Sequence, residues 1–365
     1  MATGTGGRRW LPGKKTLGIV AVVLAVLAGV GWWAKPVWQP WWYAATLCGG
    51  NLSGGELADL LPNERLRAGK DTFGSGSSLL RCGVNENDGR HFVLKIEAQT
   101  GVGAVADPMA LEFTIPSKPH YAFPRSVPGF YGQFGPVIIQ ECPKLGRDSR
   151  GRTQRLVTTV YVHAVEDDPS PQSLRTAVRI ANGASAEIGC GAAPLPLPDD
   201  VEPARKLTLS QTKDTMCGWL AGARLPDSPS GKEWRVVAPT DARAPITSCS
   251  LIDSGTGQSA VDLTGWYGDW TDEPFEMLFA ANVRIPEGRS PRDAMLGPHF
   301  GRAKARCGRE AANFLADSHA RGSSRSALPM SEVRDLLNRF AADQAERRGC
   351  TGLELPDTTV HPSGH

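Results

Sequence analysis

The sequence predicts an α+β protein in which one N-terminal transmembrane helix precedes two tandem duplicated domains. Three observations lead to this prediction: an uninterrupted apolar run, two sets of four cysteines with the same rhythm, and 28 prolines and 41 glycines among 365 residues. So many turn-forming residues favour short antiparallel strands over long helices. Each domain is therefore expected to pack an antiparallel sheet with two helices, stapled by two disulfides.

The apolar run Leu17–Trp33 is the first element, and its flanks set its orientation. A hydrocarbon core about 30 Å thick requires about 20 helical residues, so residues 16–34 are just long enough to cross it. Four basic residues lie within 1–15, whereas the first acidic residue is Glu56. This bias places the N-terminus in the cytoplasm. We expect a basic cytoplasmic stub over 1–15, a transmembrane helix over 16–34 that contacts the lipid bilayer, and a C-terminal bulk outside the cell membrane.

Aromatic residues and two prolines crowd the next segment, 35–46, which we interpret as a juxtamembrane stalk with its rings at the headgroup level. A cleaved signal peptide is the alternative to a permanent anchor, because its apolar core has a similar length. The small-x-small pattern that a signal peptidase needs occurs only as Gly29-Val30-Gly31, inside the apolar run. This placement favours an uncleaved anchor.

The charge balance excludes nucleic acid as a partner. Of the 40 basic residues, five lie at or before Lys35, which leaves 35 basic against 38 acidic residues for the rest of the chain. A near-neutral body lacks the clustered Lys and Arg that neutralise phosphates.

The eight cysteines divide the exported part into two repeats. They are separated by 34, 60 and 48 residues in the first set and by 32, 58 and 43 in the second. Flanking residues also agree, since Leu47-Cys48-Gly49 corresponds to Met216-Cys217-Gly218, and Asp107–Phe113 to Glu273–Phe279. The shared rhythm predicts an internal duplication. The expected parts are repeat 1 over 47–194, a linker over 195–206, repeat 2 over 207–356 and a loose tail over 357–365.

Local patterns give the elements of one repeat. Residues 53–61 are typical of a capped short helix, and Asn87-Asp88-Gly89 marks a hairpin between strands at 79–84 and 91–98. Three further strands are expected, at 111–115, 137–141 and 156–165. The repeat closes with a helix that begins at Ser170-Pro171, and the corresponding helix of repeat 2 is expected to have Ser331 as its cap.

Exported cysteines in even number are expected to form disulfides. Four cysteines allow three pairings in each repeat, and we favour the one in which every bond joins a terminal helix to a strand. The expected pairs are Cys48–Cys82, Cys142–Cys190, Cys217–Cys249 and Cys307–Cys350. A zinc site is excluded, because its cysteines lie about two to four residues apart, and here none are closer than 27.

No motif indicates a cofactor, a metal or a catalytic residue. The segments 101–106 and 255–260 resemble the dinucleotide fingerprint GxGxxA, which works only where the glycines open a helix. Both are interpreted as loops between strands. The acidic residues 166–168 are interpreted as solvated groups before a helix, and the serine-rich segment 74–78 as a flexible loop.

The most distinctive segment is Trp266–Glu273. It occupies the position of the loop 101–107 in repeat 1, which contains no aromatic residue. The additional aromatic and acidic residues are therefore not required by the shared fold. Because aromatic residues are favoured at recognition surfaces, this loop is a candidate interaction surface. The residues concerned are Trp266, Tyr267, Asp269 and Trp270. The other interpretation, which the residue types favour, is that Trp266 and Trp270 cap the core of repeat 2.

The Cys48-Gly49 start, the short helix with Leu57, the strand with Cys82 and the closing helix before Cys190 form a recognisable layout. The layout resembles the small disulfide-bonded α/β domains of actinobacterial cell-envelope lipoproteins and of extracytoplasmic kinase sensor regions. The resemblance covers about 48–350 and implies no site residues. The chain departs from the lipoproteins, because the small residue expected before the cysteine is missing.

We therefore expect a single-pass, outward-facing protein of the cell envelope. Its repeats are expected to bind an envelope protein, a wall polymer or a small ligand without catalysis. One alternative is a wall-acting hydrolase that uses paired carboxylates such as Asp269 and Glu273. Another is a carrier that holds apolar ligands between sheet and helices.

Overall fold

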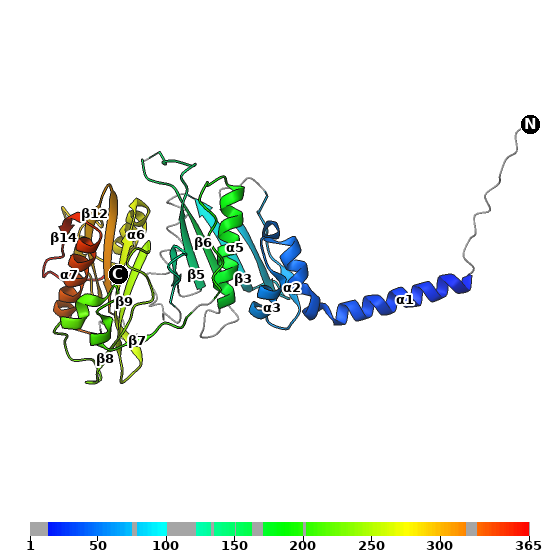
Figure 1. Ribbon diagram of the computed structural model, residues 1–365, viewed down its shortest axis with the longest axis horizontal. Coiled ribbons are helices and arrows are strands. Elements are labelled where there is room, and N and C mark those ends of the chain that lie inside the picture. Colours follow the sequence, from blue (N-terminus) through cyan, green and yellow to red (C-terminus); the bar gives the residue numbers. More distant parts are fainter. Residues whose placement is uncertain are drawn as a thin grey trace, which may run out of the picture.

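The computed structural model describes residues 14–74, 79–100, 122–132, 135–149, 151–162, 171–199, 202–318 and 327–364, with side chains from residue 19 onward. The protein is a mixed α+β structure with two antiparallel sheets and four disulfides, as the sequence predicts. Helix α1 projects from one end of the molecule, sheet 1 follows, and sheet 2 lies at the far end (Figure 1).

The apolar run forms α1 (Lys14–Trp33), and α2 (Lys35–Thr46) follows it after Ala34. Within the described residues no single helix is long and apolar enough to cross a membrane. The pair Ile19–Trp33 and Lys35–Thr46 reaches that length and composition together, with a bend of 81° between the two helices. The segment 35–46 is thus a helix that packs on repeat 1, where the sequence suggested a stalk.

Sheet 1 has the strand order β1-β2-β3-β6-β5-β4. Its strands are β1 (Leu66–Ala68), β2 (Leu79–Glu86), β3 (Phe92–Thr100), β4 (Gly129–Gly132), β5 (Gly135–Glu141) and β6 (Arg155–Val162). The helices of repeat 1 are a 3-10 turn (Cys48–Gly50), α3 (Gly54–Leu60) and α5 (Pro171–Glu187). The short helix, the hairpin and the closing helix are confirmed, whereas the expected strand at 111–115 lies outside the described residues.

Sheet 2 has the order β11-β12-β13-β10-β9-β8-β7, and β14 also pairs with β12. Its strands are β7 (Lys206–Leu207), β8 (Trp234–Val237), β9 (Ile246–Asp253), β10 (Gln258–Tyr267), β11 (Met295–Leu296), β12 (Phe300–Cys307), β13 (Glu310–Asp317) and β14 (Cys350–Glu354). Its helices are α6 (Asp272–Asn282), α7 (Met330–Arg347) and the 3-10 turns at Leu209–Thr212, Gly218–Gly222 and Asp269–Thr271.

The two sheets share one strand order. Without β7 and β14, sheet 2 reads β8-β9-β10-β13-β12-β11, which has the same connections as β1-β2-β3-β6-β5-β4. The disulfides occupy matching places, since Cys82 and Cys249 lie in the corresponding strands β2 and β9. This agreement favours the predicted internal duplication, and the four pairings are those expected from the sequence.

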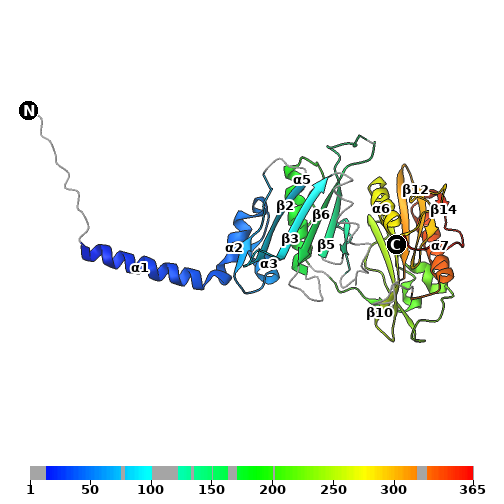
Figure 2. The same cartoon turned by 180° about the vertical axis from the view of Figure 1, so that it is seen from behind.

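Alternating side chains give each sheet two buried faces. In sheet 1, Ile138 contacts the core under α5, whereas its neighbours Val137 and Ile139 point to the other side. In sheet 2, Phe314 lies in the core under α7 and Leu315 points away from it. The faces turned away from α5 and α7 meet each other, and α6 lies between the two sheets beside this contact. The layers therefore run α5, sheet 1, sheet 2, α7, with α6 between the sheets (Figures 1 and 2).

Three segments have contacts or boundaries that the sequence did not predict. The predicted loose tail packs on repeat 2, because the His361 amide donates to the Leu296 carbonyl at 2.9 Å and Ser363 bridges to Val283. The described part of the linker lies along α5, where Leu195 N donates to Asn182 Oδ1 at 2.8 Å. Helix α7 begins at Met330 after Pro329, so Ser331 is inside the helix and is not its cap.

Removal of one disulfide tests this architecture. Replacing both Cys217 and Cys249 by Ala is expected to lower the free energy of unfolding by roughly 3–4 kcal/mol, because the unfolded chain regains the freedom of the closed loop. Chemical denaturation measures the loss. Non-reducing peptide mapping of the wild type is the control, and a bond between the two repeats would contradict the fold.

Candidate functional site

The segment Trp266–Glu273 lies between the two sheets and not on an open surface. Strand β10 ends at Tyr267, a 3-10 turn covers Asp269–Thr271, and α6 begins at Asp272. The side chains of Trp266 and Trp270 are buried, at 3% and 2% exposure. The aromatic residues proposed as an interaction surface therefore contact other parts of this chain.

The rings form a core that both repeats share. Phe130 of β4 packs edge-on against Trp266, with ring centroids 5.7 Å apart. Trp266 also packs against Trp270 at 5.9 Å and Phe275 at 6.1 Å. The cluster continues with Val137, Ile139 and Val157 from sheet 1 and with Ile246, Leu278, Phe279, Val283, Met295, Phe300 and Leu315 from repeat 2. The segment is thus the centre of an interface between the repeats.

Arg155 adds a charged bridge at the edge of this core. Its Nη2 lies 2.7 Å from Glu310 Oε2 in sheet 2 and 3.1 Å from Glu141 Oε1 in sheet 1. The arginine side chain is only 7% exposed, whereas the side chains of Glu310 and Glu141 are 28% and 70% exposed. Water therefore screens the pair with Glu310 less than the pair with Glu141. One guanidinium therefore ties together the first residues of β6 and β13.

The turn after β10 depends on glycine at position 268. Gly268 has φ +123°, a region that side chains rarely adopt. A Cβ at this position would lie 2.5 Å from Trp270 Cδ1 and 2.7 Å from Arg155 Nη1. The glycine therefore lets the backbone approach both the buried ring and the bridging cation.

Backbone and rim contacts complete the interface. Phe123 N donates to the Pro239 carbonyl of repeat 2 at 2.7 Å, and Ala122 N donates to the Glu202 carbonyl of the linker at 2.8 Å. Arg125 and Asp241 form an exposed ion pair across the same boundary at 3.2 Å. The repeats therefore share apolar, charged and backbone contacts.

The two carboxylates considered for hydrolysis have partners within the chain. Asp269 Oδ1 accepts a hydrogen bond from Ala311 N at 2.8 Å, which ties the turn to β13. Glu273 Oε2 lies 3.9 Å from Arg152 Nη1 of repeat 1. Both groups contribute to the local structure of the interface.

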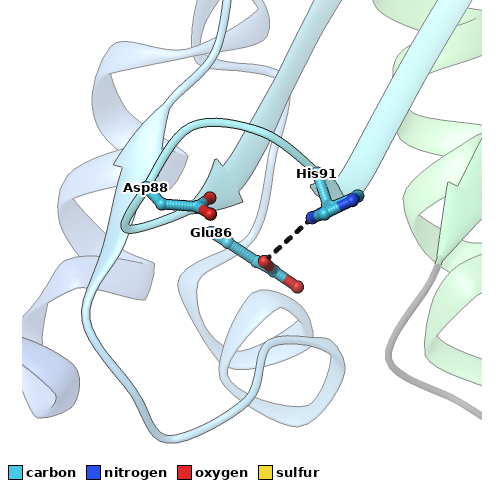
Figure 3. Close-up of side chains that lie close together, drawn as sticks. All are labelled: Glu86, Asp88 and His91. Atoms are coloured by element: carbon cyan, nitrogen blue, oxygen red, sulfur yellow. Dashed lines mark hydrogen bonds and ion pairs between the residues drawn. The ribbon is translucent and has the colours of Figure 1, made fainter.

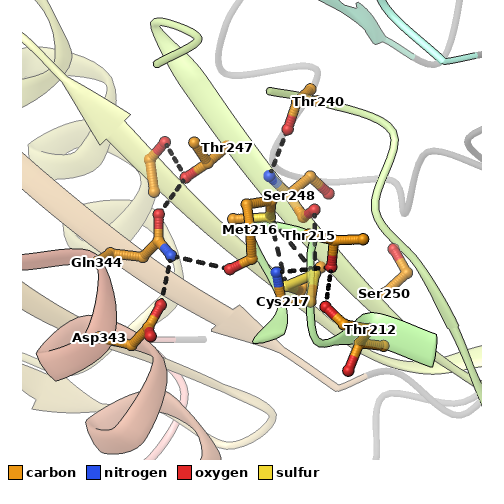
Figure 4. Close-up of a disulfide and its surroundings, with 12 residues drawn as sticks. Thr212, Thr215, Met216, Cys217, Thr240, Thr247, Ser248, Ser250, Asp343 and Gln344 are labelled. Atoms are coloured by element: carbon orange, nitrogen blue, oxygen red, sulfur yellow. Dashed lines mark hydrogen bonds between the residues drawn. A yellow bond between two sulfur atoms is a disulfide. The ribbon is translucent and has the colours of Figure 1, made fainter. Parts of the chain in front are cut away.

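Tyr267 points to the opposite face of β10, into the core under α7 that also holds the Cys217–Cys249 disulfide. Figure 4 shows Thr247, Gln344 and Met216, which form a buried polar group beside this disulfide. Its hydroxyl lies 3.1 Å from Thr247 Oγ1 and 3.2 Å from Gln344 Oε1. The Gln344 amide donates in turn to the Met216 carbonyl at 3.2 Å. Burial raises the pKa of Tyr267, and the neighbouring Arg348 opposes this effect. These contacts fasten α7 to the loop before Cys217.

A second buried cation lies under α6. Arg302 is 1% exposed, and its guanidinium lies over the Phe275 ring at 5.1 Å and donates to Asn313 and to the Pro291 carbonyl. Burial lowers the pKa of Arg302 to about 10, although Asp272 acts in the opposite direction. The arginine remains charged at neutral pH and holds α6 on sheet 2.

One group of side chains in the described residues has the donors of a metal site. Glu86, Asp88 and His91 lie around the hairpin turn between β2 and β3, with ligand atoms within 4.8 Å of one another (Figure 3). His91 Nδ1 is 3.3 Å from Glu86 Oε2, and Asp88 Oδ1 accepts from Arg90 N at 2.8 Å. All three residues are at least partly exposed. This cluster is not among the residues predicted from the sequence, although the spacing ExDxxH across a tight turn signals it.

The remaining sequence candidates divide into two groups. The segments 101–106, 166–168 and 75–78 lie outside the described residues. The segment 255–260 covers part of the turn between β9 and β10 and the first three residues of β10, and it opens no helix. Burial disfavours the charge on Asp253 at its base, but hydrogen bonds from Ser230, Gly255 and Ser228 lower the pKa of this carboxyl overall.

Comparison with known proteins found no matching family model, no matching curated protein and no matching solved structure. The candidate site therefore rests on the chain's own geometry.

Helix α6 was not expected from the sequence. Asp272 and Glu273 followed by Pro274 are typical of a helix start, and Phe275, Leu278 and Phe279 recur at helical spacing. These residues are a sequence signal for a helix at this position. The role of Phe130 and Arg155 in the interface had no local signal, because their partners in repeat 2 lie more than a hundred residues away.

A double-mutant cycle tests the shared core. Phe130→Ala and Trp266→Ala are each expected to lower the free energy of unfolding, by about 3–5 kcal/mol for a fully buried aromatic side chain. Their combined effect is expected to differ from the sum by about 0.5–1.5 kcal/mol, because the rings pack edge-to-face. Denaturant titration of the four proteins measures this coupling.

The matched control combines Phe130→Ala with Phe340→Ala, since Phe340 lies in the separate core under α7. These two changes are expected to add. Strict additivity of Phe130→Ala and Trp266→Ala would contradict a shared core.

Proposed function

We propose that this chain is a single-pass, membrane-anchored protein of the cell envelope, with its N-terminus in the cytoplasm and its two repeats outside. The repeats bind an envelope protein, a wall polymer or a small ligand, and they do so without catalysis.

The observation that carries this proposal is the exposure of the apolar side chains of α1. Leu24 and Leu27 are each 61% exposed and Val30 is 59% exposed, on a helix that projects from one end of the molecule (Figure 1). A soluble monomer rarely exposes so large a continuous apolar surface. A bilayer covers such a helix on all sides, and the basic residues before it favour a cytoplasmic N-terminus.

Two further features support the orientation and the role. Disulfides persist in oxidising compartments, and all eight cysteines follow α1 and are paired. Repeat 2 lies at the end of the molecule farthest from α1 (Figure 2). This position favours repeat 2 as the part that meets a partner beyond the membrane surface.

The proposed membrane anchor is tested by measuring whether the mature protein keeps its N-terminal segment and stays in the membrane fraction. The mature protein is expected to keep residues 1–34 and to resist alkaline carbonate extraction. Replacing Leu24 and Leu27 by Lys is expected to release it from membranes, because each lysine at a helix centre costs about 2.5–3.5 kcal/mol on insertion. Replacing the same two residues by Ile is the control and should leave the protein in place. A mature chain that starts after Gly31 would contradict the anchor.

The binding role is tested in intact cells. Crosslinking followed by mass spectrometry is expected to recover one class of partner, with the crosslinked peptides concentrated in repeat 2. Recovery of nothing above background would contradict the binding role. Turnover of a wall fraction that is lost on Asp269→Ala would instead favour the hydrolase alternative.

A further inference from the structure

Helix α2 has one face fixed to repeat 1. Gln39 and Tyr43 on this face are buried, at 1% and 4% exposure. The Tyr43 hydroxyl and Lys35 Nζ both donate to the Leu66 carbonyl at 2.8 Å, and Leu66 N donates to Gln39 Oε1 at 3.1 Å. Three side chains of α2 thus converge on the first residue of β1, so the helix is held against the sheet.

The opposite face of α2 exposes three tryptophans at helical spacing. Trp38, Trp41 and Trp42 are 43%, 55% and 59% exposed. Trp38 and Trp42 pack edge-on, with centroids 6.4 Å apart. The Trp41 ring lies against Gly54 at the start of α3, where a Cβ would approach its Cδ1 to 2.5 Å. The rings are therefore ordered by their contacts and remain open on their outer sides.

This tryptophan face is continuous with the apolar surface of α1. Trp38 Nε1 donates to the Gly31 carbonyl in the last turn of α1 at 3.0 Å, so the face lies on the side of α2 where α1 ends. Trp32 and Trp33 are 63% and 80% exposed at the same corner. The Arg65 guanidinium covers the Trp32 ring at 4.7 Å, which places a cation beside the aromatic group.

The angle between α1 and α2 determines how the tryptophan face is oriented relative to a membrane that α1 crosses. The axes of α1 and α2 meet at 81°. If α1 crosses a bilayer near its normal, α2 lies close to the plane of the membrane. Tryptophan rings are favoured at the headgroup level, because the ring is apolar and the indole N–H is polar. Helices with one apolar face lie in this interface.

We infer that α2 is an interfacial helix whose Trp38, Trp41 and Trp42 lie among phospholipid headgroups, so that repeat 1 is docked on the outer leaflet. This inference rests on the proposed membrane anchor and deepens it. The occupant of the tryptophan face is the same bilayer that covers α1.

The test is depth-dependent quenching of tryptophan fluorescence in the full-length protein. The protein is placed in nanodiscs of phosphatidylcholine and phosphatidylglycerol that carry bromine either near the headgroup or near the bilayer centre. Shallow bromine is expected to quench the wild type more than deep bromine. The variant W38F/W41F/W42F is expected to lose about half of the shallow quenching, because three of the five tryptophans between residues 32 and 42 are replaced.

Two matched variants make the result specific. Trp234→Phe changes a buried ring in repeat 2 and is expected to leave the quenching unchanged. W32F/W33F removes only the tryptophans of α1. Non-reducing peptide mapping for the four disulfides checks that every variant is folded.

The outcomes of this experiment distinguish the interfacial role of α2 from the membrane anchor formed by α1. Shallow quenching that is lost in W32F/W33F but kept in W38F/W41F/W42F would overturn the interfacial role of α2 and retain the anchor. The same pattern together with a crosslinked dimer would assign the face to a second copy. Absence of quenching in every protein would overturn the anchor as well.

Discussion

The arrangement of the whole body depends on the burial of a second apolar face on each sheet. A helix covers one face of each sheet, α5 on sheet 1 and α7 on sheet 2, and the remaining faces still carry large apolar side chains. Apolar area exposed to water is costly, at about 25 cal/mol per Å². The two faces meet around Trp266, and each repeat thereby completes the core of the other.

The disulfides lie outside the core that the two repeats share. Each pair joins residues of one repeat that are between 32 and 48 positions apart. The bonds therefore lower the conformational entropy of the unfolded chain within each repeat separately. Contacts between the repeats are apolar packing, hydrogen bonds and ion pairs, among them the Arg155 bridge. Internal stability and mutual orientation therefore have separate physical sources.

Local patterns predicted those parts of the fold that depend on near neighbours. The turn at Asn87-Asp88-Gly89, the alternating strands beside it and the cysteine rhythm were sufficient for the first hairpin and the disulfide pairs. The place of Trp266 could not be predicted in this way, because an aromatic residue in a loop suits a surface and a core equally well. Phe130, a partner far away in the sequence, is one of the residues that cover it. The packed tail was missed for the same reason, since its bridges to Leu296 and Val283 give no pattern in its own residues.

The docking of α2 on Leu66 has a mechanical consequence. A domain on a flexible stalk swivels when its outer end is pulled, and the stalk absorbs the motion. Here Lys35, Gln39 and Tyr43 fasten α2 to sheet 1, and the shared core fastens sheet 1 to sheet 2. In the proposed setting, a lateral force on repeat 2 passes through these contacts to α2. The load reaches the bend at Ala34 as a torque on the anchoring helix.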